Sequence, residues 1–122
     1  MKDPITIYIA GPVTGVHNYR ETFMEAEEDV NSHGYIALSP AHLPQGMTNE
    51  QYMRICFAMI DAADAVLFLE GWENSPGASL EHNYAKYTKK PIVYQHRQII
   101  GEGLDTPTRR AWLALDLKEV LN

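Results

Sequence analysis

Short apolar runs alternate along the chain with longer segments in which apolar residues recur every three or four positions. Four runs have the length and the β-branched content of buried strands: residues 5–10, 35–38, 65–69 and 91–94. Helical spacing of apolar residues follows each run, in residues 19–30, in the segment after Thr48, in residues 77–89 and in the segment after Thr106-Pro107. The pattern predicts four strands, each followed by a helix.

Residues at the ends of these segments support the same division. Asn18 stands where the first helix should have its N-cap, and Gly34 stands where it should stop. Thr48 and Gln51 have the spacing of a capping box. Two prolines and a glycine mark residues 40–47 as loop.

A strand–helix alternation with right-handed crossovers gives a parallel sheet with helices on both faces. We expect a single α/β domain of flavodoxin-like (Rossmann-like) type over residues 1–122, with strand order 2-1-3-4. Ligands of such sheets bind beyond the carboxyl ends of the strands, here between the first and third strands.

Composition narrows the classes of function. Ten basic against sixteen acidic residues give a net charge of −6, which argues against a nucleic-acid groove. We expect no membrane span and no signal peptide, and Cys56, the single cysteine, favours a cytoplasmic protein. The five histidines form no metal-binding spacing, so we expect no metal site. We also expect no cofactor.

Two glycine-bearing loops leave the first and third strands and should face one crevice: residues 10–15 and residues 71–81. The second loop runs into a helix start, where free N–H groups and the hydroxyls of Ser75 and Ser79 could accept an anion. The alternative is that Ser75 is simply an N-cap before Pro76. Both roles can coexist.

Glu81 lies near the end of the first turn of that helix. It is either an exposed acid that the helix dipole stabilises or a carboxylate that points into the crevice and attacks carbon or takes a proton. Trp72 could stack on a base or anchor the core, and Tyr8 could line the crevice or lie buried. Asp64 is expected to be structural and Cys56 to be core.

Three motifs resemble the nucleoside 2-deoxyribosyltransferase superfamily, and most of all its short phage and prophage members. They are Tyr8-Ile9-Ala10-Gly11-Pro12, Ala63-Asp64 at the start of an apolar strand, and Ser75-x-Gly77-x-x-x-Glu81 followed by Ala85 and Lys90-Pro91-Ile92. The resemblance covers residues 4 to 94.

The resemblance implies a function and a site. Glu81 would be the nucleophile that attacks the anomeric carbon, and serine at position 75 implies a nucleotide 5′-monophosphate rather than a nucleoside. Ser75, Gly77 and Ser79 would hold phosphate or sugar, and Tyr8 and Trp72 would contact the substrate. Gly11, Pro12 and Thr14 would shape the opposite wall.

The chain departs from the superfamily at Cys56, where a second carboxylate usually helps to protonate the leaving base. The acid could come instead from Glu73, His82 or another chain, the reaction could differ, or a base with a low demand for protonation could leave without it. Loss of that acid favours a second hypothesis, a nucleotide-binding or sensing module without turnover; a third is an interaction protein that reuses the fold. Superfamily members commonly complete their sites across subunits. We therefore expect at least a homodimer, with Tyr52, Met59, Tyr84 and Tyr87 as possible contacts.

Overall fold

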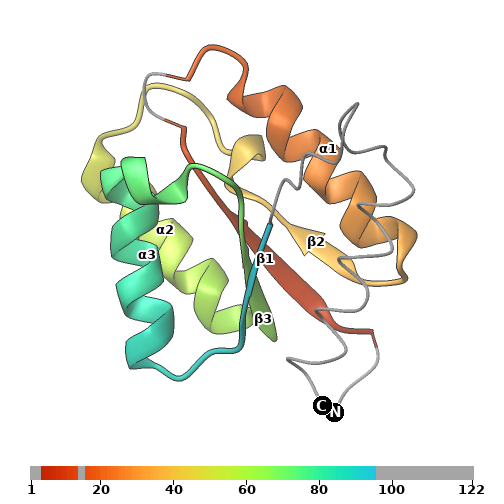
Figure 1. Ribbon diagram of the computed structural model, residues 1–122. Coiled ribbons are helices and arrows are strands. Elements are labelled where there is room, and N and C mark those ends of the chain that lie inside the picture. Colours follow the sequence, from red (N-terminus) through yellow and green to blue (C-terminus); the bar gives the residue numbers. More distant parts are fainter. Residues whose placement is uncertain (1–3, 14–15, 96–122) are drawn as a thin grey trace, which may run out of the picture.

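The four apolar runs form one parallel sheet (Figure 1). The computed structural model describes residues 4–13 and 16–95. Its strands are β1 (Thr6–Ala10), β2 (Ile36–Leu38), β3 (Ala65–Phe68) and β4 (Ile92–Tyr94), in the order β2-β1-β3-β4. This is the predicted order, so the topological switch point, where the connections of adjacent strands leave for opposite faces of the sheet, lies between β1 and β3.

Register ties the two central strands together along their length. Tyr8 pairs with Val66 of β3 on one side and with Leu38 of β2 on the other. At the start of the sheet, the Thr6 N–H donates to Asp64 Oδ2 at 2.8 Å. Asp64 therefore bridges the entries to β3 and β1, which is the structural role expected for it.

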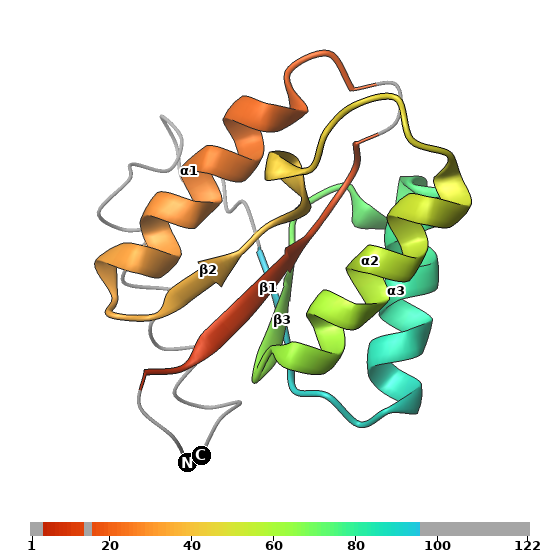
Figure 2. The ribbon, with the colours of Figure 1, turned by 180° about the vertical axis from the view of Figure 1, so that it is seen from behind.

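Three α-helices cover the sheet on its two faces: α1 (Tyr19–Ser32), α2 (Asn49–Ala62) and α3 (Pro76–Tyr87). Helix α1 lies on one face, and α2 and α3 lie side by side on the other, as the two opposite views show (Figures 1 and 2). Two short 3-10 turns, η1 (Pro40–His42) and η2 (Trp72–Asn74), lie in the connections after β2 and β3. The η1 turn falls in a segment that we expected to be loop, and the Ser39 hydroxyl caps it by accepting from the Ala41 N–H.

Helix ends follow the sequence signals with one exception. The Thr48–Gln51 capping box is formed at α2, and Gly34 has the left-handed φ of +83° expected after the end of α1. Asn18 precedes α1, but its side chain caps no N–H, so the prediction of a side-chain cap is wrong. Its backbone carbonyl instead accepts from the Thr22 N–H at 3.3 Å.

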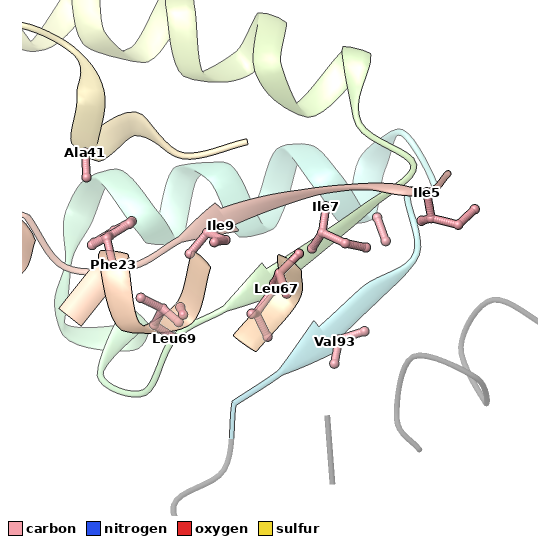
Figure 3. Packing of buried hydrophobic residues seen from close by; sticks show 11 residues of the cluster. Ile5, Ile7, Ile9, Phe23, Ala41, Leu67, Leu69 and Val93 are labelled. Atoms are coloured by element: carbon pink, nitrogen blue, oxygen red, sulfur yellow. The ribbon is translucent and has the colours of Figure 1, made fainter. Parts of the chain in front are cut away.

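The alternation of side chains along β1 divides the core into two clusters. Ile5, Ile7 and Ile9 point to the α1 face, where they pack with residues that include Phe23 and Leu67 (Figure 3). Tyr8 and Ala10 point to the opposite face and pack under α2 and α3. The period of two in a strand therefore delivers the phenol of Tyr8 to the side of the sheet that carries α3.

Within the part of the chain that the structure describes, no helix is long and apolar enough to span a membrane. The helix predicted after Thr106 lies outside the described residues, as does Thr14.

Candidate active site

The Glu81 carboxylate is buried against the sheet. Glu81 is 5% exposed, and its Oε2 accepts a hydrogen bond of 2.5 Å from the Tyr8 hydroxyl. Tyr8 is itself fully buried in the middle of β1. Glu81 is therefore not an exposed first-turn acid, and Tyr8 is a buried residue whose polar end meets the acid.

The start of α3 sets the direction in which Glu81 points. Ser75 caps the helix by accepting from the Ala78 N–H at 3.3 Å, and Pro76 occupies the first helical position. From there Ala78, Glu81 and Ala85 follow at steps of three and four, and all three are buried. One helix face therefore buries two small apolar residues and one acid against the β1–β3 region.

A cavity of about 470 Å³ opens beside this acid at the carboxyl end of β1. Four predicted site residues line it: Gly11, Ser75, Gly77 and Glu81. The rest of the wall comes from the loop after β1, from the connection after β2 and from all three helices: Val13, Tyr19, Pro40, Leu43, Gln45, Asn49, Tyr52, Met53, Cys56, Pro76, Ala78 and Leu80. The volume lies within the range of small-molecule sites.

Burial controls the ionisation of the groups beside the cavity. Burial raises the pKa of Glu81 to about 7, although the hydrogen bond from Tyr8 and the contact with Cys56 partly oppose this shift. Burial also raises the pKa of the Cys56 thiol to about 12, and it raises the pKa of Tyr8 well above its usual value. Near neutral pH the site therefore holds one carboxyl group, close to its point of ionisation, between a neutral phenol and a neutral thiol.

The helix start offers a limited set of donors to a ligand. Pro76 has no N–H, and the Ala78 N–H bonds to Ser75. Ser75 and Gly77 both line the cavity, at the positive end of the helix dipole, and the Gly77 N–H belongs to the first turn, whose N–H groups have no acceptor within the helix. These groups can bind an anion without a basic side chain.

The two glycines of the cavity wall differ in whether the packing of the fold requires them. A Cβ on Gly11 would lie 3.0 Å from Leu69 Cβ, so the packing of the chain itself requires glycine there. A Cβ on Gly77 would meet only Met53 Sδ at 3.6 Å, an ordinary contact. No close contact in the fold accounts for Gly77, and its missing side chain leaves the backbone open to the cavity.

Tyr8 bonds to Glu81 but is not part of the cavity lining, and three further predicted site residues within the described part also lie away from it. The Trp72 ring stacks on His82, with centroids 4.1 Å apart, in an aromatic cluster with Phe68 and Tyr94. The Ser79 hydroxyl donates to the Glu73 carbonyl at 3.4 Å. Pro12 lies beside Gly71 of the turn after β3, because a Cβ added to that glycine would lie 3.5 Å from Pro12 Cγ. Trp72 is placed as an aromatic anchor rather than as a wall of the cavity.

Several wall residues were missed by sequence reasoning. Tyr19 and Tyr52 were assigned to apolar helix stripes, and Gln45 was placed in a featureless loop. The available signal was the position of that loop directly after β2, at the same sheet edge as the two glycine-bearing loops. Cys56 was assigned to the core, and it is indeed buried, but it also forms part of the cavity wall.

Other acids and bases of the region have partners elsewhere. Asp61 accepts from the Tyr84 hydroxyl at 2.6 Å, and His82 shares a 2.7 Å hydrogen bond with the Tyr94 hydroxyl. Neither lines the cavity. Among residues 4–13 and 16–95 there is no group of three His, Cys, Asp or Glu side chains arranged to hold a metal ion.

Comparisons with known proteins agree with this fold. Among solved structures, the "2-desoxiribosyltransferase from Leishmania mexicana" is similar with a TM-score of 0.59 and 18% sequence identity, over 87% of this chain and 82% of that chain. The likeness shows a common α/β fold. A comparison with curated proteins finds no match. A family model described as "Domain of unknown function (DUF4406)" matches residues 5–94, a range that spans the whole sheet, α1 to α3 and the cavity. The chain therefore belongs to the DUF4406 family.

Proposed function

We propose that this protein cleaves the N-glycosidic bond of a nucleotide 5′-monophosphate or a related nucleoside, with Glu81 as the nucleophile. One observation carries the proposal: a buried carboxylate, fixed by the Tyr8 hydroxyl, lies in the wall of a cavity at the carboxyl ends of the neighbouring strands β1 and β3. A buried acid in a concave site with a shifted pKa is characteristic of a catalytic group.

The chemistry needs only this acid, a substrate and an acceptor. Glycosidic bonds break through an oxocarbenium-like transition state, which a neighbouring carboxylate stabilises and then captures as a glycosyl ester. Water then gives hydrolysis, and a second base gives transfer. The Tyr8 hydrogen bond holds Oε2, so Oε1 is the oxygen that we assign to the attack. No cofactor enters these steps.

The helix start at Ser75 is the proposed phosphate site. Ser75 and Gly77 both line the cavity that contains Glu81, and the Ser75 hydroxyl and the Gly77 N–H are the donors we assign to the phosphate. A hydroxyl at position 75 can donate to a phosphate, whereas an acidic group there would repel it. The solved structure of similar fold is named a 2-desoxiribosyltransferase, and this name supports the proposed glycosidic chemistry rather than the phosphate site.

A second candidate function is a nucleotide-binding or sensing module without turnover. The observation that favours it is the composition of the cavity wall, in which the described residues include no carboxylate besides Glu81. A neutral nucleotide would then meet a nucleophile without an acid to protonate its base.

The test is base release by the purified protein from a panel of ribonucleoside and deoxyribonucleoside monophosphates and their nucleosides, measured by chromatography. We expect release by the wild type and at least a thousandfold loss in Glu81→Gln. The matched control is Glu28→Gln, an exposed acid on α1 away from the cavity, which should keep full activity.

Two results would contradict the enzyme. Tight nucleotide binding without release, unchanged in Glu81→Gln, would establish the binding module instead. Release that persists in Glu81→Gln would remove Glu81 as the nucleophile.

A further inference from the structure

The cavity contains a nucleophile but no strong acid among the described residues that line it. Its polar side chains are two phenols, one thiol, one hydroxyl, two amides and the Glu81 carboxylate: Tyr19, Tyr52, Cys56, Ser75, Gln45, Asn49 and Glu81. There is no histidine, lysine, arginine or aspartate in this set. The set therefore offers no second carboxylic acid and no cation.

The protons nearest to Glu81 are held in other bonds or are weakly acidic. The Tyr8 proton is donated to Glu81 itself, and the Tyr52 hydroxyl donates to the Pro44 carbonyl. The Cys56 thiol is a poor acid because burial raises its pKa to about 12. Tyr19 remains the strongest competing donor, since hydrogen bonds from Gln45 and Arg20 lower the pKa of its phenol.

The charge and the shape of the wall favour a cation instead. Glu81 is the only side chain in the described wall that carries a full charge when it ionises, and no basic side chain there competes for it. Tyr19, Tyr52 and Met53 add aromatic and thioether surface to the same cavity wall. Aromatic faces and a desolvated carboxylate together attract a flat cationic ring.

Resting on the proposed function, the geometry points to a substrate class: N-ribosides or N-deoxyribosides whose base carries a fixed positive charge, such as ribosyl pyridiniums and N7-alkylated purine nucleotides. A Glu81 oxygen bonds to C1′ while the C1′–N bond breaks, and the electron pair stays on the ring nitrogen, where it cancels the positive charge. The base leaves neutral and needs no proton. Water then attacks C1′, the ester bond to Glu81 breaks, and the surplus proton of the water goes to solvent.

A neutral base behaves differently in the same site. It leaves as an anion unless an acid protonates it during bond cleavage, and general acid catalysis typically contributes about 10²–10⁴-fold. Selection by leaving-group charge therefore follows from the absence of a second acid among the described residues that line the cavity with Glu81.

The test compares guanosine 5′-monophosphate with its N7-methyl derivative, a pair that differs by one methyl group and one charge. Base release is measured by chromatography, with the rate of Glu81→Gln subtracted as background. We expect kcat/KM at least about 100-fold higher for the N7-methyl compound, in line with the missing acid. Nicotinamide mononucleotide serves as a second, structurally unrelated cation and should also be cleaved.

The glycosidic bond of the cationic compound is also intrinsically weaker, and the variant Cys56→Asp separates this effect from selection by the cavity wall. A second carboxyl group beside Glu81 would keep its proton, because two close carboxylates do not both ionise, and it would act as the missing acid. This variant should narrow the ratio of kcat/KM between the two compounds by about 100-fold. The uncharged control of similar size, Cys56→Asn, should not narrow it. Circular dichroism melts identify a variant that fails to fold, and cleavage of the neutral compound by the wild type and by Tyr19→Phe then decides.

Failure of this inference and failure of the proposed function give different results. Cleavage of both guanosine compounds at similar, Glu81-dependent rates would overturn the charge selection and leave the glycosidase intact. Cleavage of the neutral compound that disappears in Tyr19→Phe would also overturn it and would identify Tyr19 as the acid. Cleavage of no compound at all would remove the proposed function itself.

Discussion

The side chains around Glu81 show how one buried acid is kept in place without an opposite charge. Tyr8 donates a short hydrogen bond to it, Cys56 lies beside it, and both groups stay neutral because burial raises their pKa values. A buried carboxylate with neutral partners keeps a high pKa, since no cation stabilises its charged form. The neutral neighbours and the burial of Glu81 therefore determine the pH range in which the carboxyl group ionises.

Activity should depend on the ionisation of Glu81. With a pKa of about 7, kcat/KM for base release should rise as the pH increases from 6 to 8 and level off above that range. The Tyr8 hydrogen bond lowers this pKa, so Tyr8→Phe should move the midpoint of the pH profile upward and recover part of its lost activity at high pH. A loss that is equal at every pH would contradict this role for Tyr8. The measurement is a pH–rate profile of both proteins.

Stability should respond to pH in the opposite sense. The Glu81 carboxyl has a pKa of about 7 when folded and an ordinary value near 4.5 when unfolded, so the folded state holds the extra proton between these values. Its stabilising contribution is present below about pH 4.5 and is lost as the pH rises to about 7, by up to about 3 kcal/mol. Denaturant midpoints of the wild type and of Glu81→Gln, compared at pH 5 and pH 8, measure the difference. A constant gap between the two proteins would contradict the buried, proton-linked acid.

At the scale of elements, helix starts position the site more than helix interiors do. Helix α2 begins at the Thr48 capping box and supplies Tyr52, Met53 and Cys56 to the cavity wall. Helix α3 begins at Ser75, beside the cavity, and supplies Glu81. Each cap fixes where its helix begins, and the 3.6-residue period then determines which residues face the sheet.

Removal of the α2 cap should therefore weaken one wall of the site. Thr48 accepts from the Gln51 N–H at 3.1 Å, and its own N–H donates to Gln51 Oε1 at 2.9 Å. Thr48→Ala should lower the free energy of unfolding by about 1 kcal/mol. The matched control is Asn18→Ala at the start of α1, where no side-chain cap exists, and its effect should stay within about 0.5 kcal/mol. Equal effects of the two substitutions in urea denaturation would show that the capping box contributes nothing to stability.

At the scale of the whole molecule, α3 presents apolar surface next to the site. Leu80 is 53% exposed and forms part of the cavity wall, and Tyr87, further along the same helix, is 87% exposed. Exposed apolar groups beside an open cavity are typical of a surface that a partner covers. We therefore keep the prediction that the protein forms at least a homodimer, with α3 at the interface.

Light scattering coupled to size exclusion tests the association. We expect a dimer or larger species for the wild type and a shift toward monomer in Leu80→Glu, because the added charge would be buried at the interface. Lys86→Glu on the outer side of α3 serves as a charge-changing control and should leave the mass unchanged. A monomeric wild type at high concentration would contradict the prediction.

Local patterns were enough to determine the elements and their order. Alternating apolar runs, the Thr48 capping box and the left-handed Gly34 are set by interactions within a few residues, so the sequence alone predicts β1 to β4, α1 to α3 and the sheet order. The distance in sequence from Ser75 to Glu81 also places Glu81 near the start of the predicted helix. The resemblance to the superfamily then implied that the Glu81 carboxylate is the nucleophile.

Which side chains meet that carboxylate was decided only by the tertiary structure. Tyr8 reaches Glu81 over 73 positions of sequence, and Tyr19 and Tyr52 enter the same cavity from separate helices, whereas Trp72 stacks on His82 instead. Such contacts depend on how each helix is rotated and placed on the sheet, which no local period encodes. The burial that moves the pKa of Glu81 to about 7 has the same origin, because desolvation comes from every element packed around the group.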